Sequence, residues 1–210
     1  NKIFSDKKNI FCNDSNKVHL ITNQDRTKLL GKHNLSNIIA AITVSKIFKI
    51  RNSAIKKVLE NFNPLPHRME KVETNKDMIF INDSKSTNIY STTSAIKSFT
   101  NNIILILGGC SKEKLEKNLL INAINRKNII KVICYGSIGE KVSNIIKKIK
   151  PVCYYKVFKD AVLKSINSAK NNEVILLSPG FKSFDQFNNF EERGIEFKNI
   201  INQHIEQDEN

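Results

Sequence analysis

The chain has 210 residues, of which 40% are hydrophobic and 26% are charged. This composition is typical of a soluble globular protein, and no run approaches the roughly 18 apolar residues that a membrane-spanning helix needs. The net charge of +14 would suit a nucleic-acid binder, but lysine is scattered along the chain and arginine is scarce. A dedicated binder concentrates its basic residues and interleaves aromatic ones, so we expect no nucleic-acid partner.

The beginning of the chain has neither a methionine nor an apolar leader, so no secretion signal is indicated. Strand-like sequence starts almost at once, and we therefore expect a fragment of a longer, cytoplasmic bacterial protein. The cysteines are widely spaced, lack a C-x-x-C pair and are expected to be reduced thiols; they are Cys12, Cys110, Cys134 and Cys153. The four histidines lack the spacing of a zinc site, so we expect no metal held by protein groups alone.

In the first third of the chain, a polar opening rich in Asn and Lys precedes a short strand at residues 18–22. Apolar residues then recur at helical spacing over residues 35–48, with Asn34 able to cap the start of that helix. A second helix at residues 53–62 ends before Pro64 and Pro66, whose fixed φ suits a rigid connector. We therefore divide the chain into domains at residues 1–65 and 66–210.

The second domain alternates apolar runs with amphipathic segments of helical length. The runs lie at residues 78–81, 103–107, 132–135, 152–157 and 174–177, and the helical segments at residues 89–99, 115–126, 139–149, 159–169 and 186–203. Continuous Ile, Val and Leu runs are typical of parallel strands that are covered on both faces. We predict an α/β fold, a Rossmann-like doubly wound sheet of about six mostly parallel strands with helices on both faces, and residues 69–73 as an added edge strand.

Ligands of such sheets bind beyond the carboxyl ends of the strands, which singles out four loops in advance. These loops are residues 82–88, 108–112, 136–137 and 178–185. The first carries an acid, a lysine and several small polar side chains, which could hold a ribose hydroxyl or a carboxylate, although Thr87 or Asn88 could equally be a plain helix N-cap. In the second, Gly108 and Gly109 allow a close backbone approach and Lys112 offers a charge, although a glycine pair is also ordinary turn chemistry.

Taken in order, five segments resemble the MurD family, the UDP-N-acetylmuramoyl-L-alanine:D-glutamate ligases. They are residues 31–37 (G-K-H-N-L-S-N), 65–70 (L-P-H-R-M-E), 82–88 (N-D-S-K-S-T-N), 108–112 (G-G-C-S-K) and 178–194, which contains S-F-D-Q-F-x-x-F-E-x-R-G. The resemblance covers essentially the whole chain. It assigns residues 1–65 to the end of the family's central ATPase domain and residues 66–210 to its C-terminal, amino-acid-binding domain.

The resemblance implies an ATP-dependent ligase of peptidoglycan synthesis. ATP phosphorylates the carboxylate of UDP-N-acetylmuramoyl-L-alanine, and the amine of D-glutamate then displaces phosphate from the acyl phosphate. The positions that match the family's ATP contacts are Asn34, Asn37, Arg68 and Asp83. Their alternatives are a cap and a surface amide for the two asparagines, a surface ion pair for Arg68 and a strand-end turn for Asp83.

The positions that match the family's D-glutamate contacts are Lys85, Thr87, Lys112, Ser183, Phe184 and Phe190. A dianion needs a cation and several neutral donors, which this set contains. Ser183 and Phe184 could instead be ordinary helix-entry residues, and Phe190 a core aromatic.

The chain departs from the family pattern beside the expected amino-acid pocket. Cys110 and Ser111 stand where an acidic residue is common, and Phe181 and Lys182 replace residues that are usually small. No G-x-x-x-x-G-K-[ST] sequence occurs, so this chain should not catalyse alone, we assign it no catalytic residue, and Mg²⁺ would be held mainly outside it. The alternative is a truncated or degenerate, non-catalytic binding domain. We expect a monomer in either case.

Overall fold

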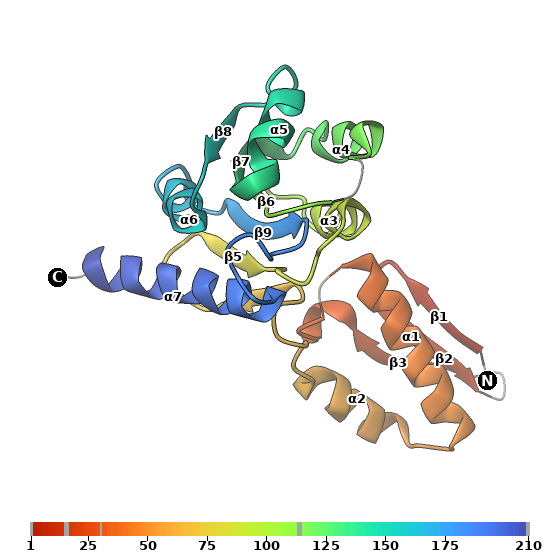
Figure 1. Ribbon diagram of the computed structural model, residues 1–210. Coiled ribbons are helices and arrows are strands. Elements are labelled where there is room, and N and C mark those ends of the chain that lie inside the picture. Colours follow the sequence, from red (N-terminus) through yellow and green to blue (C-terminus); the bar gives the residue numbers. More distant parts are fainter. Residues whose placement is uncertain (1, 15–16, 30, 113–114, 209–210) are drawn as a thin grey trace. The chain divides into compact units, whose positions relative to one another are not determined.

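The computed structural model describes residues 2–14, 17–29, 31–112 and 115–208 (Figure 1). The chain forms two compact units, Asn1–Pro64 and Leu65–Asn210. Within the described residues, none of the helices combines the length and the apolar character required to cross a membrane.

The first unit is a three-stranded antiparallel sheet, in the order β1-β2-β3, with two helices. Its elements are β1 (Lys2–Asp6), β2 (Asn9–Asp14), β3 (Lys17–Asn23), the 3-10 helix η1 (Gln24–Arg26), α1 (Lys32–Ile47) and α2 (Asn52–Asn61). A small core joins the sheet to both helices and contains Ile10, Cys12, Ile21, Ile38, Ile42, Ile55 and Leu59. Ile38 and Ile42 lie one turn apart, so the helical spacing in the sequence identified the buried side of α1 correctly.

The strand-like opening forms β1 and β2, and the alternation along β2 places Ile10 and Cys12 on the buried face. One expectation for this unit was wrong. The helix α1 begins at Lys32 with Gly31 as its N-cap, so Asn34 lies in the first turn and does not cap the helix.

The second unit is an α/β domain whose elements alternate along the chain. Its strands are β4 (Glu70–Val72), β5 (Ile79–Asn82), β6 (Ile103–Gly108), β7 (Ile129–Tyr135), β8 (Val152–Tyr155) and β9 (Val174–Gly180). Its helices are α3 (Ile89–Ile96), α4 (Lys117–Ile124), α5 (Gly136–Ile146), α6 (Phe158–Ile166) and α7 (Phe190–Asp208).

The strands form one six-stranded sheet in the order β4-β5-β9-β6-β7-β8. All neighbouring strands are parallel except the edge pair β4 and β5. Helices α3, α4 and α5 cover one face, and α6 and α7 cover the other (Figure 1). The predicted fold class, a doubly wound and mostly parallel sheet with helices on both faces, is confirmed.

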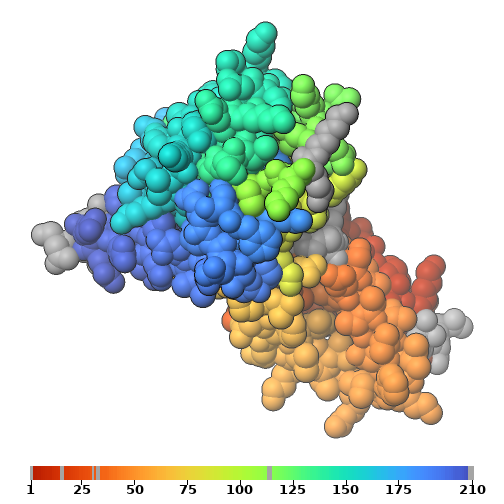
Figure 2. Space-filling view, in the orientation of Figure 1, coloured from red at the N-terminus to blue at the C-terminus, as the bar shows by residue number. Residues whose placement is uncertain are grey.

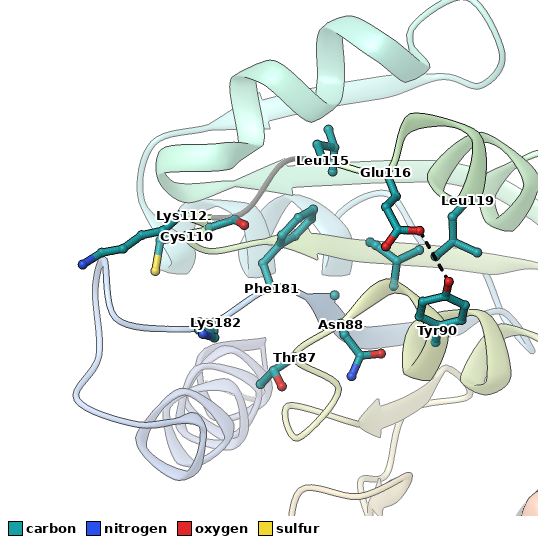
Figure 3. Close-up of a pocket in the computed structure, with 13 residues that line it drawn as sticks. Thr87, Asn88, Tyr90, Cys110, Lys112, Leu115, Glu116, Leu119, Phe181 and Lys182 are labelled. Carbon is teal, nitrogen blue, oxygen red and sulfur yellow. Dashed lines mark hydrogen bonds between the residues drawn. The ribbon is translucent and has the colours of Figure 1, made fainter.

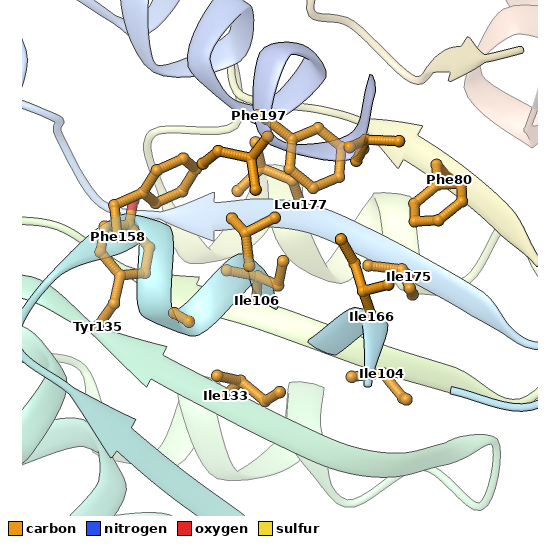
Figure 4. Close-up of a cluster of buried hydrophobic side chains, with 14 of the residues drawn as sticks. Phe80, Ile104, Ile106, Ile133, Tyr135, Phe158, Ile166, Ile175, Leu177 and Phe197 are labelled. Carbon is orange, nitrogen blue, oxygen red and sulfur yellow. The ribbon is translucent and has the colours of Figure 1, made fainter. Parts of the chain in front are cut away.

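The core between the sheet and the helices α6 and α7 is shown in Figure 4. Alternate strand residues such as Ile104 and Ile106 point into it, and Phe158 and Phe197 supply the largest helical side chains. The rings of Tyr135 and Phe158 meet edge to face with centroids 4.9 Å apart. Because Tyr135 ends β7, this aromatic contact links the core to the edge of the sheet where the loops lie.

The starts of α5 and α7 differ from their predicted positions at residues 139 and 186, and in both helices a side chain accepts an N–H of the first turn. Helix α5 starts at Gly136, directly after β7, and the Asp185 carboxylate accepts the Ser137 N–H at 3.0 Å. Helix α7 starts at Phe190, after Asn189, whose side chain accepts the Glu192 N–H at 2.7 Å. Residue Gln186, predicted as the first residue of that helix, instead accepts the Phe158 N–H at the start of α6.

We expect Phe197→Ala to destabilise the second unit by about 3 to 5 kcal/mol, because the ring is fully buried and its loss leaves a cavity against the sheet. The matched control is Ile195→Ala on the same helix, where the side chain is 49% exposed and a change below about 0.5 kcal/mol is expected. The chain has no Trp and its four Tyr all lie after Leu65, so tyrosine fluorescence during urea unfolding reports this unit alone. Equal losses in the two variants would contradict the packing.

Candidate active site

The strand order itself creates a crevice at the carboxyl ends of the central strands. Strands β5 and β6 continue into α3 and α4 on one face of the sheet, whereas β9, which lies between them, continues toward α7 on the other face. The loops that leave β9 and its two neighbours therefore diverge. In an open α/β sheet this reversal is the expected position of a ligand site.

A cavity of about 210 Å³ lies at this reversal (Figure 3). The three diverging loops line it, with Thr87 and Asn88 after β5, Cys110 to Lys112 after β6, and Gly180 to Lys182 from β9. The remaining wall comes from α3, the approach to α4 and the first turn of α4, and it includes Tyr90, Leu115, Glu116 and Leu119. The volume suits a small ligand such as an amino acid.

The loops after β6 and β9 are joined by their backbones. The Cys110 N–H donates to the Lys182 carbonyl at 2.8 Å in an isolated antiparallel bridge. In the space-filling view, the blue segment after β9 lies directly against the green segment after β6 (Figure 2). Gly109 adopts a φ of +121°, and a Cβ there would overlap the Lys182 carbonyl, so the close approach requires glycine.

A single buried guanidinium ties three of the loops together. Arg193 in the first turn of α7 is fully buried, and its Nε donates to Ser84 Oγ at 2.9 Å and its Nη2 to the Ser84 carbonyl at 2.7 Å. Its Nη1 donates to the Tyr135 hydroxyl at 3.2 Å and to the Phe181 carbonyl at 3.1 Å. All four acceptors are neutral. Burial raises the pKa of Tyr135 to about 12 although the nearby Arg193 charge lowers it, so this hydroxyl keeps its proton at neutral pH.

Asp83 follows β5 in the first of the four loops and is only 3% exposed. It accepts the hydroxyls of Ser86 and Ser178, the latter at 2.8 Å, and the Met69 N–H at 3.2 Å. Burial raises the pKa of Asp83 from 3.8 to about 6, and these donors, together with the charge of Arg68, act in the opposite direction. The carboxylate therefore anchors the connector after Pro66 to the sheet.

Of the residues predicted to contact D-glutamate, Thr87 and Lys112 line the cavity together. Lys85 and Phe190 lie elsewhere and contact each other, with the Lys85 ammonium 5.5 Å from the centre of the ring. Ser183 is buried and Phe184 is largely exposed, and neither lines the cavity.

The residues predicted to contact ATP are divided between the two units. Asn34 and Asn37 lie one turn apart on α1, and the Asn37 amide donates to the Asn34 side-chain oxygen at 3.3 Å. In the second unit, Arg68 is exposed, and its charge lowers the pKa of Asp83.

The sequence left open whether Asn88 is a plain helix N-cap. The Asn88 side chain accepts the Ser91 N–H at 2.9 Å at the start of α3, so the capping interpretation of this residue was correct.

Sequence reasoning missed two residues that shape the site, namely Arg193 and Tyr135. Arg193 lies among acidic residues and looks like part of a solvent-exposed face. Its spacing from Phe197 and Ile200, however, places it on the buried side of α7, and that spacing was the available signal.

The sequence matches the family model described as "Mur ligase, glutamate ligase domain" over residues 67–181. The fold and the cavity at its topological reversal agree with this match, and the chain belongs to the Mur ligase family.

Among curated proteins, the chain is similar to enzymes named UDP-N-acetylmuramoylalanine–D-glutamate ligase. It is 41% identical to the one from Oenococcus oeni over 86% of this chain and 41% of the relative. It is 42% identical to the one from Buchnera aphidicola over 86% of this chain and 41% of the relative, and 35% identical to the one from Caldicellulosiruptor bescii over 97% of this chain and 44% of the relative. The chain thus spans less than half the length of these relatives.

Solved structures of Mur ligases share the fold at low sequence identity. The UDP-N-acetylmuramate-alanine ligase MurC of Thermotoga maritima superposes with a TM-score of 0.65 at 14% identity, over 94% of this chain and 44% of that one. The MurF ligase of the same organism, solved in complex with ADP, gives 0.61 at 13% identity, over 97% of this chain and 46% of that one.

We expect Asp83 to make the stability of the second unit fall as pH rises from about 4 to about 6. Its folded pKa of about 6 lies above the unfolded value of 3.8, so the folded state binds the extra proton in this interval and loses that advantage as the proton leaves. The contribution is on the order of 2 to 3 kcal/mol. The stability difference between the original chain and Asp83→Asn, measured by urea unfolding at pH 4, 5, 6 and 7, should therefore decline with pH. A difference that is constant or rises with pH would contradict the raised pKa.

We expect Arg193→Met to destabilise the second unit by about 3 kcal/mol, because it leaves buried acceptors without donors. Arg126→Met, at an exposed arginine, is the control and should change stability by less than about 0.5 kcal/mol. Hydrogen exchange should also become faster at the Cys110 and Gly180 amides if the loops loosen together. Unchanged exchange at both amides would show that Arg193 does not hold the loops.

Proposed function

We propose that the chain is the acceptor-amino-acid part of an ATP-dependent ligase that adds D-glutamate to UDP-N-acetylmuramoyl-L-alanine in peptidoglycan synthesis. Residues 1–65 are then the end of the central ATPase domain, and residues 66–210 are the C-terminal domain. The observation that carries the proposal is the cavity at the topological reversal, which both Thr87 and Lys112 line. The names of the relatives, each at least 35% identical in the three comparisons above, support the same substrate.

The proposed reaction joins two substrates through an acyl phosphate. The γ-phosphoryl group of ATP passes to the carboxylate of the UDP-sugar-linked alanine, and the amine of D-glutamate attacks the acyl carbon. The amide C–N bond forms as the C–O bond to phosphate breaks, and the amine loses its proton. The contribution of this chain is to hold the amino acid in place, because correct positioning supplies much of the acceleration in such reactions.

In this proposal D-glutamate lies among Lys85, Thr87, Lys112, Ser183, Phe184 and Phe190. Lys112 provides the charge and Thr87 a neutral donor, both on the cavity wall. A carboxylate that receives an ammonium and a hydroxyl donor gains charge-assisted hydrogen bonds, which are the stronger class. Ser183, Phe184 and Phe190 lie on the segment that leads from β9 to α7.

ATP is proposed to contact Asn34, Asn37, Arg68 and Asp83. Arg68 is an exposed cation suited to a phosphate, and the two asparagine amides suit the adenine base. A ribose hydroxyl could bond to Asp83 Oδ1, which accepts the Met69 N–H at 3.2 Å and has a further lone pair, since the hydroxyls of Ser86 and Ser178 both donate to Oδ2. The phosphate loop and the groups that hold Mg²⁺ would be supplied by further sequence of the full-length protein, in keeping with the limited span of this chain.

A cytoplasmic, monomeric enzyme without a nucleic-acid partner completes the proposal, since ATP and UDP-sugars are cytoplasmic substrates. The departures at Cys110, Ser111, Phe181 and Lys182 leave a non-catalytic binding domain as the alternative. Release of phosphate from ATP by the full-length protein, dependent on both UDP-N-acetylmuramoyl-L-alanine and D-glutamate, would establish the ligase. Its absence from a folded full-length protein would favour the binding domain.

We expect Lys112→Ala in the full-length protein to raise the KM for D-glutamate at least tenfold and to change the KM for ATP less than twofold. The reason is that the lysine lines the cavity proposed for the amino acid and its removal costs one charge-assisted interaction. Lys97→Ala, at an exposed lysine at the end of α3, is the control and should change neither constant. An unchanged KM for D-glutamate in Lys112→Ala would overturn the assignment of the cavity.

A further inference from the structure

We propose that Asp185 is a positioning residue of the acceptor site, which acts through Ser183 and makes no contact with the amino acid itself. The inference rests on the proposed function and extends it to a residue outside the set assigned above. Asp185 belongs to a turn at residues 183–187, between the cavity wall that ends at Lys182 and the start of α7. The attachment of this turn therefore decides where Ser183 lies.

Hydrogen bonds to the Ser183 carbonyl close the turn. This carbonyl accepts the Gln186 N–H at 3.1 Å and the Phe187 N–H at 2.9 Å. Ser183 is only 3% exposed, so its surroundings leave little freedom for its side chain. Because the two ends of the turn are joined in this way, a movement of the side chains at its tip also moves Ser183.

The Asp185 carboxylate attaches the tip of the turn to the N-terminus of α5. Its Oδ2 accepts the Ser137 N–H at 3.0 Å, and a helix of 11 residues favours a negative charge at this end. The approach is close, because a Cβ on Gly136, which has a φ of +73°, would overlap Oδ2. The carboxylate can therefore reach α5 only because residue 136 is glycine.

The next side chain attaches the same turn to a second helix. The Gln186 side-chain oxygen accepts the Phe158 N–H at 2.9 Å at the start of α6, and its amide donates to the Lys156 carbonyl at 3.1 Å. The rings of Phe187 and Phe158 also meet edge to face, with centroids 5.2 Å apart. These contacts remain when Asp185 is replaced, so its loss should shift the turn locally without unfolding it.

Stability alone is a weak explanation for a carboxylate at this place. The second oxygen of Asp185, Oδ1, is buried and has no hydrogen-bond partner within the part of the chain that the structure describes. A buried acceptor without a donor is unfavourable, and more so when it is charged. The position of Asp185 is better explained by what it does for the turn, which begins at Ser183 beside the cavity.

The test is a double-mutant cycle between Asp185 and Ser183 in the full-length ligase. We expect the KM for D-glutamate to rise about tenfold in Ser183→Ala and about fivefold in Asp185→Ala, with the KM for ATP within twofold in both. Because Asp185 acts through the Ser183 hydroxyl, the double variant should show about the tenfold effect of Ser183→Ala alone, whereas independent effects would multiply to about fiftyfold. Asp185→Asn keeps an acceptor for the Ser137 N–H and should restore the KM to within threefold of the original.

Two further variants and a second measurement separate positioning from a general loss of stability. Asp185→Leu fills a similar volume without an acceptor and should reproduce the effect of Asp185→Ala on the KM. Asp160→Ala is the matched control, because it removes an exposed carboxylate from the first turn of α6 and should leave both constants unchanged. Hydrogen exchange at the Ser137 and Phe187 amides should become faster in Asp185→Ala and stay unchanged in Asp160→Ala.

The outcomes distinguish this inference from the proposed function. If Ser183→Ala raises the KM for D-glutamate and Asp185→Ala does not, positioning by Asp185 is refuted and the proposed function stands. Multiplied effects in the double variant, or an unchanged KM in Ser183→Ala, would likewise overturn the inference. If neither Ser183→Ala nor Lys112→Ala affects D-glutamate, the proposed function itself loses its support.

Discussion

The buried guanidinium of Arg193 is the interaction on which the geometry of the candidate site depends. Its nitrogens donate to the loop after β5, to the end of β7 and to the loop after β9. Because a guanidinium is planar and rigid, these three segments keep one mutual arrangement. A desolvated charge whose acceptors are all neutral is expensive to bury, and apolar packing could have stabilised the fold at least as well. Its retention is better explained by the placement of the loops and by the positive potential below the cavity.

The position of Arg193 follows in turn from the packing of α7 on the sheet. Phe197 lies four residues after Arg193 and Ile200 lies seven after it, so all three occupy one side of the helix. Phe197 and Ile200 belong to the core under α6 and α7. The apolar contacts therefore fix the rotation of α7 about its axis, and this rotation directs Arg193 in the first turn toward the loops. The reversal of the strand order at β9 makes this possible, since it sends α7 to the face opposite α3 and α4.

The same physical reasons decide which features could be predicted from the sequence. The run at residues 103–107 was recognisable as a strand because β6 is buried on both faces, and the loops at its end followed from the general rule for parallel sheets. The bounds of β1 and β2 could not be predicted from the strand-like opening, because these strands are short and have few buried positions among Asn and Lys. The start of α7 was misplaced because Gln186 caps another helix, a long-range contact that periodicity does not encode. The helical spacing could reveal that Arg193 is buried, but its contacts with Ser84 and Tyr135, which lie far away in the sequence, could not be predicted.

Cys110 and Phe181, which depart from the family pattern, contribute to the site in different ways through their backbones and their side chains. Cys110 and Phe181 contribute to the framework through the Cys110 N–H and the Phe181 carbonyl, and any residue can supply these groups. The Phe181 side chain is accommodated by turning into the cavity, where it is 6% exposed and faces Leu115 (Figure 3). These substitutions therefore alter the surface that meets the ligand and leave the arrangement of the loops intact. Under the proposed function, the Phe181 ring makes the wall of the amino-acid cavity larger and more apolar, while the Phe181 carbonyl still accepts from Arg193.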